Sequence, residues 1–182
     1  MTIREELNKN PEEFKKIGFI FYCLIRIEIN LNLLIDSCFC VFRVGQHPIE
    51  VNQTTGMIFN RALHDKNIFP TLENKRRFLL KMIDILEKDA KRSGLSFEAE
   101  RWRNFCRSIL KVQETRNNLA HKFFSFPGNN AASYIVPKRD QSFESKNIKL
   151  DDEIGEVERV YEESETAITE FLSQALNVFR YS

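Results

Sequence analysis

Residues 17–42 read IGFIFYCLIRIEINLNLLIDSCFCVF, and this stretch decides the fold. Its apolar residues recur every three or four positions, which predicts one long α-helix with an apolar stripe. The stripe consists of Ile17, Ile20, Leu24, Ile27, Leu31, Leu34, Cys38 and Val41. A second apolar stripe follows another side, through Tyr22, Ile25, Ile29, Leu33 and Cys40. An apolar helix face must be covered, so we expect the chain's other helices to pack on the first stripe. The second stripe is expected to lie against the same helices or against a second subunit.

Polar residues within the same stretch bear on where the protein works. Arg26, Glu28, Asn30, Asn32 and Asp36 interrupt the apolar run throughout. Such groups are costly at the centre of a bilayer, so we interpret the segment as a buried helix and not as a membrane span. The first residues carry acids and no apolar core of a secretory signal. The sequence therefore predicts a cytoplasmic protein without a membrane role.

The composition indicates one ordinary globular domain covering residues 1–182. Hydrophobic residues make up 42% of the chain, and 27 Lys and Arg face 26 Asp and Glu. A net charge of +1 excludes a uniformly basic nucleic-acid binder, so any contact with RNA must be local. Only six glycines and five prolines argue against a turn-dense all-β fold. The four cysteines, which are Cys23, Cys38, Cys40 and Cys106, are expected to be buried free thiols.

Start and stop signals predict the remaining elements. They are a short helix over 54–65, helices over 71–94 and 97–124 capped by Thr71 and Ser96, and a last long helix from 151 onward. Within the irregular residues 127–150, the segments 133–136 and 143–148 are predicted to pair as a small hairpin. The expected fold class is therefore all-α: a bundle of four long helices and one short helix.

Charge is uneven along the chain. Between Arg61 and Lys122 there are fifteen Lys or Arg and eight Asp or Glu, whereas residues 151–170 hold nine acids and one arginine. A solvated helix face explains such runs most simply. The alternative is that the basic half, including the pairs Arg76/Arg77 and Arg101/Arg103, meets a phosphate backbone.

Polar residues interrupt the apolar pattern of the helix at residues 101–124, which read RWRNFCRSILKVQETRNNLAHKFF. Its apolar stripe of Trp102, Phe105, Cys106 and Ile109 continues into Gln113, Arg116, Asn117 and Ala120. Burying polar groups without partners is costly, so the sequence must either satisfy these residues or use them. One interpretation is a functional site. The other is a buried polar network, for instance with Glu28, Asn30 or Asn32 of the first helix.

At this point the residues Arg116-Asn117-Asn118-Leu119-Ala120-His121 resemble the R-x(4–6)-H motif of the HEPN superfamily. The context also matches, because the family motif lies near the C-terminal end of a long helix in an α-helical bundle and another long helix follows. The resemblance implies an HEPN-like fold. It also implies a metal-independent endoribonuclease, commonly a toxin or an effector of antiphage or stress defence, that works as a dimer.

The resemblance also implies roles for three residues. His121 would act as general acid or base, Arg116 would hold the scissile phosphate, and Asn117 would orient the histidine or the phosphate. Asn117 and His121 are four apart and share a helix face, whereas Arg116 and His121 are about 140° apart around the axis. We therefore expect a homodimer that pairs the motif-bearing helices. No cofactor and no metal are expected.

Two further expectations concern partners and competing sites. The partners implied are RNA, a second copy and a cognate antitoxin such as a nucleotidyltransferase-like protein. The alternative function is a catalytically silent HEPN module that binds a nucleotide, RNA or a protein. His47 and His64 have no metal-ligand spacing to acids or cysteines, so we interpret them as surface histidines.

Overall fold

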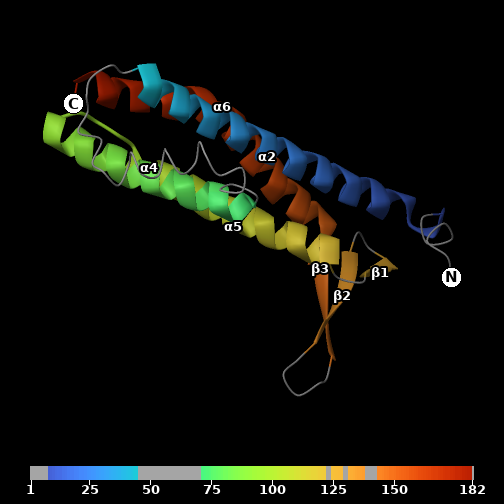
Figure 1. The fold of residues 1–182 in the computed structure, drawn as a ribbon. Coiled ribbons are helices and arrows are strands. Elements are labelled where there is room, and N and C mark those ends of the chain that lie inside the picture. The colour runs from blue at the N-terminus through green and yellow to red at the C-terminus, as the bar shows by residue number, and fades with distance from the viewer. Residues whose placement is uncertain (1–7, 45–70, 122–123, 129–130, 138–142, 182) are drawn as a thin grey trace. The chain divides into compact units, whose positions relative to one another are not determined.

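The computed structural model describes residues 8–44, 71–121, 124–128, 131–137 and 143–181. The four long helices are α2 (Pro11–Val44), α4 (Leu72–Ser93), α5 (Ala99–His121) and α6 (Leu150–Tyr181) (Figure 1). The predicted all-α fold class with four long helices is confirmed. The short helix predicted over 54–65 lies outside the described residues.

The ends of α4 follow the predicted signals. The hydroxyl of Thr71 accepts a hydrogen bond from the backbone N–H of Asn74 at 3.2 Å, which satisfies one free donor of the first turn. Gly94 ends the helix in the left-handed region at φ 68°, and its N–H donates to the carbonyl of Ala90. A side chain is rarely stable at this φ, so glycine is the residue that fits.

The ends of α5 differ from the prediction. The helix begins at Ala99 and not at Phe97, so the predicted cap at Ser96 is wrong. Glu98 stands at the cap position instead: its carbonyl accepts from Trp102, and its N–H donates to the side-chain oxygen of Gln174. The helix ends at His121 rather than near Phe124.

Three strands lie between α5 and α6: β1 (Phe124–Gly128), β2 (Ala131–Pro137) and β3 (Phe143–Lys149), paired antiparallel in that order. The predicted hairpin is confirmed, because Ser133 pairs with Asn147 and Val136 with Glu144. Strand β1 was not predicted, since its Pro and Gly suggested only a helix stop. Strand β3 passes without a loop into α6 (Figure 1).

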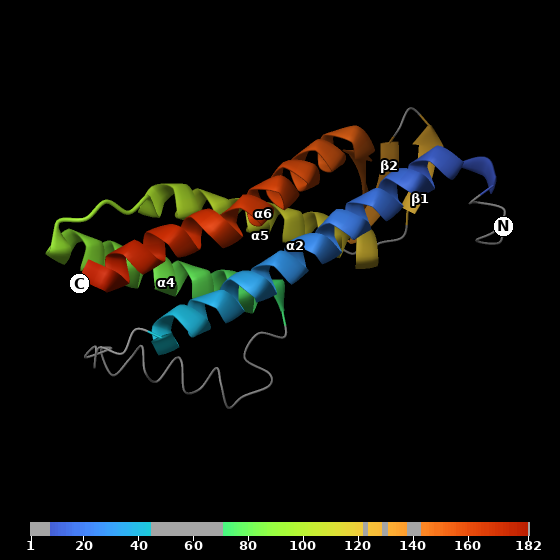
Figure 2. The same ribbon diagram turned by 90° about the horizontal axis from the view of Figure 1, so that it is seen from above.

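The chain divides into two compact units. The sheet unit comprises Met1–Arg26 and Lys111–Glu162, and the bundle unit comprises Ile27–Leu110 and Glu163–Ser182. Helix α2 is a single unbroken helix that contributes to both (Figure 2). The prediction of a single domain over 1–182 stays a prediction.

The bundle unit buries one face of each of its four helical segments. From α2 and α4 its core takes Ile27, Leu31, Leu34, Cys38, Leu79, Met82, Ile83, Leu86 and Ala90, the faces predicted from the spacing. From α5 and α6 it takes Trp102, Phe105, Ile109, Ala167, Phe171, Ala175 and Val178. Trp102 meets Phe171 edge to face with ring centroids 5.3 Å apart, an arrangement that aromatic quadrupoles favour.

The sheet unit has a smaller core. Its buried apolar residues come from α2, α5, the sheet and α6, and they are Ile20, Cys23, Leu24, Val112, Leu119, Ile148, Leu150, Val157 and Val160. Two polar contacts join its helices: Lys16 pairs with Asp151, and the hydroxyl of Thr115 donates to Glu153. The C-terminal part of α5 is therefore held to the start of α6.

Three cysteines confirm the thiol prediction. Cys23, Cys38 and Cys106 are free and buried. Burial raises the pKa of the Cys38 and Cys106 thiols to about 12, because a thiolate is poorly solvated in an apolar core. These two thiols stay protonated near neutral pH and behave as small hydrophobic residues.

Two polar pairs cross the interior of the bundle unit. The ammonium of Lys75, only 5% exposed, donates to Glu28 Oε1 at 2.6 Å. The side-chain amide of Asn30 donates to the hydroxyl of Ser164 at 2.9 Å. Both contacts link residues far apart in the chain, so they fix how neighbouring helices align along their axes.

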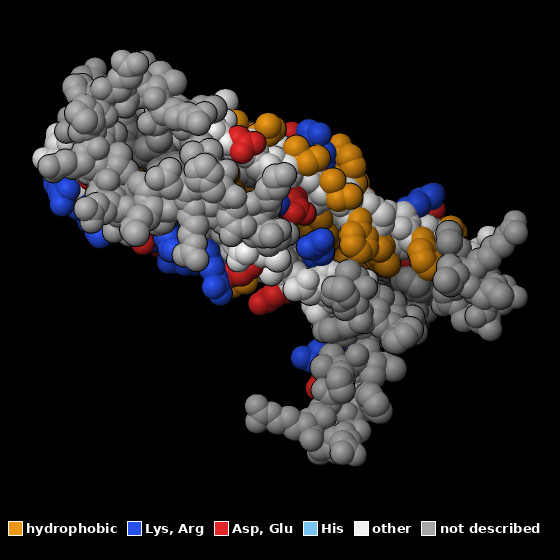
Figure 3. Space-filling model, viewed as in Figure 1, with side chains coloured by type: hydrophobic (Ala, Val, Ile, Leu, Met, Phe, Trp, Pro, Cys, Tyr) orange, Lys and Arg blue, Asp and Glu red, His pale blue; other side chains and the backbone are white. Residues whose placement is uncertain are grey.

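Four residues of the second apolar stripe of α2 are exposed, together with Phe19 beside them, whereas the side chain of Cys40 lies outside the described residues. The exposed fractions are 40% for Phe19, 54% for Tyr22, 58% for Ile25, 41% for Ile29 and 50% for Leu33. Hydrophobic side chains accordingly gather on the surface of α2 (Figure 3).

Helix α2 is also the one candidate membrane span found among the described residues. Residues Pro11–Cys38 are long and apolar enough to cross a bilayer by length and composition, and 39% of the apolar window is buried within the structure. A core helix of a water-soluble protein passes the same test.

Removing the carboxylate of Glu28 should destabilise the fold. Glu28→Ala leaves the buried ammonium of Lys75 without its partner, and we expect a loss of about 2–4 kcal/mol in the free energy of unfolding. Lys75→Met removes the charge and keeps the volume, so it should cost less than about 1 kcal/mol. Urea denaturation measures both, with Glu114→Ala at an exposed position of α5 as the control. An unchanged midpoint for Glu28→Ala would contradict the pairing.

Candidate functional site

The motif residues occupy the last two turns of α5, within the sheet unit. Arg116 and Asn117 are consecutive, and His121 is the last residue of the helix. The opposite side of these turns is anchored in the core by Val112, Thr115 and Leu119. The motif is therefore carried on a packed helix whose end is defined, as the resemblance implied.

The prediction that Arg116 and Asn117 occupy inward positions is wrong. Both side chains are exposed. The buried face of α5 turns around the helix as it advances: Trp102 and Ile109 are buried in the bundle unit, whereas Val112, Thr115 and Leu119 are buried in the sheet unit. The prediction assumed that the buried side of α5 stays in line with Trp102 along the whole helix. The buried side instead shifts by about 100° around the helix axis. The polar residues remain on the outer face.

Arg116 is an uncommitted cation. It makes no hydrogen bond or ion pair with any residue that the structure describes. Every other arginine with a described side chain has an interaction partner; the other eight are Arg26, Arg76, Arg77, Arg92, Arg101, Arg103, Arg107 and Arg159. An exposed guanidinium with its donors open is suited to binding a phosphate or carboxylate from outside the chain.

Gln113 lies one turn before this pair, and three or four residues separate it from Arg116 and Asn117. The three positions therefore share one side of α5. The Oε1 atom of Gln113 is buried and accepts no hydrogen bond within the described residues. Gln113, Arg116 and Asn117 were all predicted to face the core, and of these three only Gln113 has a buried polar atom. That acceptor has no hydrogen bond within the described residues.

His121 is placed only through its backbone. It closes α5, and position 121 follows Asn117 by four residues, so both positions lie on the same side of the helix. Its side chain lies outside the described residues. The structure therefore leaves Arg116 and Asn117 exposed and next to each other on α5, with position 121 one turn beyond Asn117 and about 140° around the helix axis from Arg116.

The proposed buried network with the first helix is not formed. Glu28 accepts from Lys75, Asn30 donates to Ser164, and Asn32 is exposed. No hydrogen bond joins these residues to Arg116 or Asn117 among the residues described. The polar residues of the motif are therefore not explained as the partners of Glu28 and Asn30.

The basic pairs of the bundle unit are committed to acids. Arg76 and Arg77 both bind Glu73, with nitrogen–oxygen distances of 2.7 and 2.6 Å. Arg101 pairs with Glu98 and Glu170, and Arg103 pairs with Asp84 and Glu87. These contacts favour the solvated-face interpretation of the local positive charge over a surface for RNA.

The carboxylates in these pairs are electrostatically stabilised. Hydrogen bonds from Arg76, then from Arg77, and the charges of both lower the pKa of Glu73 to about 2. Hydrogen bonds from Lys91 and Arg103 lower the pKa of Glu87 to about 2 as well. Both groups stay ionised throughout the physiological range, so neither is suited to proton transfer near neutrality.

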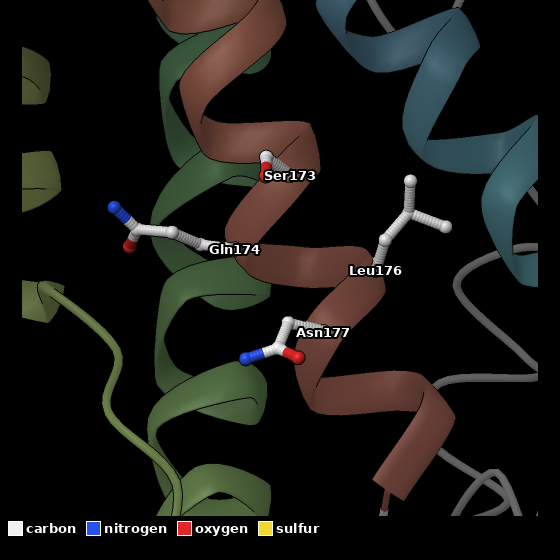
Figure 4. Close-up of a pocket in the computed structure, with 4 residues that line it drawn as sticks. All are labelled: Ser173, Gln174, Leu176 and Asn177. Carbon is white, nitrogen blue, oxygen red and sulfur yellow. The ribbon is translucent and has the colours of Figure 1, made fainter.

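A shallow hollow of about 340 Å³ lies beside α6 and is lined by Ser173, Gln174, Leu176 and Asn177. The side chains do not converge: Gln174 and Leu176 extend in different directions (Figure 4). Gln174 is occupied by structural contacts, since its oxygen accepts from the indole of Trp102 at 3.1 Å and its amide donates to Glu98. The hollow offers no titratable group, so the motif surface is the stronger candidate.

Sequence reasoning missed the buried cation of the fold. Lys75 stands at an inward position of α4, three residues after Leu72 and three before Phe78, all of which are buried. A lysine at this spacing within an otherwise apolar helix face was the feature of the sequence that could have predicted a buried cation. In the described ranges, no group of three or more His, Cys, Asp or Glu is arranged to hold a metal ion.

Comparison with known proteins adds no relative. No protein-family model matches the chain, and neither curated proteins nor solved structures give a match.

Because the motif residues are exposed, their removal should leave the fold intact. Arg116→Ala and Asn117→Ala should each change the free energy of unfolding by less than about 0.5 kcal/mol. Gln113→Met removes a buried unsatisfied acceptor and should stabilise the protein by about 1 kcal/mol. Thr115→Val, which loses the hydrogen bond to Glu153, is the control and should be destabilised. Chemical denaturation compares the four; a large loss for Arg116→Ala would show that the arginine is a structural residue.

Acid should remove the stabilisation that Glu73 provides. Its pKa in the folded protein is about 2 against an ordinary 4.5, so the contribution is present above pH 4.5 and lost as the pH falls toward 2. Glu73→Gln should therefore lower stability at pH 7 by about 1–2 kcal/mol and make little difference near pH 2. Thermal melting of both proteins across this range measures the effect. A difference that stays constant with pH would refute the link to ionisation.

Proposed function

We propose that the protein is a metal-independent endoribonuclease of the HEPN type, a toxin or an antiphage or stress-defence effector of the cytoplasm. The observation that supports this is the combination of motif and setting. The R-x4-H residues end a packed helix, and their arginine is exposed and makes no hydrogen bond or ion pair with any residue that the structure describes. RNA supplies the phosphate that such a guanidinium binds.

The chemistry proceeds through the RNA's own nucleophile. A general base takes the proton of the 2′-hydroxyl, whose oxygen attacks the adjacent phosphorus. The bond from phosphorus to the 5′ oxygen then breaks, and a general acid gives that oxygen a proton. The products are a 2′,3′-cyclic phosphate and a 5′-hydroxyl, so protons and charge balance without a metal.

Each motif residue has one task in this scheme. His121 transfers a proton, because an imidazole ordinarily titrates near neutrality. Arg116 binds the phosphate and offsets the charge that develops on its oxygens. Asn117 is a positioning residue that holds the imidazole or the phosphate by hydrogen bonding. A second copy of the chain supplies the other proton-transfer group, so the proposed site belongs to a homodimer.

Purified protein should cleave single-stranded RNA in excess EDTA. His121→Ala and Arg116→Ala should each lower the rate by about 100-fold or more, because one removes proton transfer and the other removes charge stabilisation. Lys111→Ala is the matched control for charge, since Lys111 is an exposed cation on another side of α5 with no partner among the described residues. Gel assays with a 5′-labelled RNA measure the cleavage.

Two outcomes would refute the enzyme proposal. One is a well-folded wild-type protein that leaves varied RNAs intact, which would favour a silent HEPN module that binds a nucleotide, RNA or a protein such as an antitoxin. The other is a His121→Ala variant that cuts as fast as its parent. Loss of cleavage with Lys111→Ala alone would show that bulk charge and not the motif matters.

A further inference from the structure

Strand β3 leaves one edge of the sheet open. The strand order is β1-β2-β3, so β3 pairs with β2 on one side, and no strand that the structure describes lies along its other side (Figure 1). In an antiparallel pair, alternate residues direct their N–H and C=O groups toward the neighbouring strand, and the residues between them direct these groups away. About half of the backbone groups of β3 therefore point toward the open edge.

The two edges of the sheet differ in how well they are protected. Strand β1 has five residues, contains Pro127, which has no N–H, and shifts its register against β2 between Ser125 and Gly128. A short strand, a proline and a bulge all hinder pairing with another strand. Strand β3 has seven residues, no proline, and continuous pairing with β2 from Phe143 to Lys149. Its edge is therefore regular enough to accept a further strand.

The outer end of β3 belongs to a two-stranded ribbon. Strand β1 pairs with β2 only as far as Tyr134, whereas β2 and β3 stay paired as far as Pro137 and Phe143. Residues 144–147 of β3 are all exposed, and because successive side chains point to opposite faces, neither face of this stretch is covered. A two-stranded ribbon of this kind is only marginally stable in water. A further strand along β3 supplies the third strand that stabilises it.

The exposed charges of β3 favour an acidic partner. Lys146 and Lys149 are exposed, and neither has a hydrogen bond or ion pair with a residue that the structure describes. Glu144, the one acid of the strand, already has an interaction within the chain. Lysines at a sheet edge disfavour apolar and basic strands, whereas carboxylates opposite them form cross-strand ion pairs. The open edge is therefore selective for a strand that carries acids.

We propose that the open edge of β3 binds an extended acidic peptide segment of another protein, which adds to the sheet as an antiparallel strand. Lys146 and Lys149 are three residues apart and lie on opposite faces of β3, so the carboxylates that pair with them are also three residues apart. Ile148 is buried, and an apolar residue opposite it extends that core. The segment therefore has the pattern acid-apolar-x-acid.

Backbone pairing distinguishes this partner from a nucleic acid. Two lysines also attract a phosphate chain, but RNA has no backbone groups that continue an antiparallel sheet. The regular edge of β3 would then have no part in binding. A peptide strand uses both the hydrogen-bonding edge and the two charges. The acidic peptide is for this reason the occupant we assign.

Fluorescence anisotropy with the full chain tests the proposal. The probe is a labelled peptide, Thr-Glu-Val-Thr-Glu-Thr-Thr, which has the pattern acid-apolar-x-acid. It should bind with a Kd of about 10–100 µM, because a flexible peptide loses entropy when it is ordered. The same peptide with lysine in place of both glutamates should bind at least about 10-fold more weakly. Hydrogen exchange should show that the glutamate peptide protects amides of β3.

Backbone methylation tests strand addition directly. A strand that adds to an edge turns the N–H groups of alternate residues toward it. Two versions of the glutamate peptide are therefore N-methylated, one at its first, third and fifth residues and the other at its second, fourth and sixth. Only one version should lose affinity, by about 10-fold or more. Equal affinities of the two versions would show a purely electrostatic contact and would overturn the proposal.

Charge reversal on the protein tests the register. Lys146→Glu and Lys149→Glu should each weaken binding of the glutamate peptide by about 5-fold to 10-fold, and the double variant should prefer the lysine peptide. Lys111→Glu, at an exposed lysine of α5 with no described partner, is the matched control and should change neither affinity at physiological salt. Circular dichroism verifies that each variant is folded. A double variant that still prefers the glutamate peptide would overturn the register.

The remaining outcomes separate the occupants. A glutamate peptide that does not bind at about 1 mM overturns the proposal. If the peptide does not bind and a labelled single-stranded RNA loses affinity in the double variant, the lysines are assigned to RNA instead. Peptide binding is measured without RNA, cleavage or a particular oligomeric state. Its failure is therefore distinct from failure of the proposed ribonuclease.

Discussion

Burial of one face of α2 is the contact on which both units depend. Ile20 and Leu24 belong to the core of the sheet unit, and Ile27, Leu31 and Leu34 to that of the bundle unit. Since apolar burial is the main favourable term in folding, this single helix contributes to two cores through one stripe. Its other face carries the exposed side chains of Phe19, Tyr22, Ile25, Ile29 and Leu33, so one helix contributes both to the interior and to an apolar surface.

Local signals in the sequence predicted the helices well. The stripe of α2, the inner face of α4 and the cap at Thr71 depend on residues close together in the chain, so spacing and residue type were enough. Long-range contacts were beyond such reasoning. Gln174 bonds to the cap position at Glu98, 76 residues away, and this contact rather than Ser96 marks the start of α5. Strand β1 likewise exists through its pairing with β2.

The candidate site likewise combines a part that the local sequence predicts and a part that depends on long-range contacts. The motif and its position at the end of α5 were readable from six consecutive residues. The direction in which Arg116 points was not, because the buried side of α5 depends on which elements cover each turn. The resulting correction changes the character of the site. A buried arginine would have been part of the scaffold, whereas an exposed one is free to serve a ligand at little cost to stability.

The discontinuous bundle unit has a consequence for biosynthesis. Asn30 and Ser164 are 134 residues apart, and the core that they join also takes Phe171, Ala175 and Val178 from the last helix. During translation, the apolar faces of α2 and α4 therefore emerge long before α6 is available to cover them. The nascent chain therefore carries that uncovered apolar surface until α6 has also left the ribosome and can pack against it.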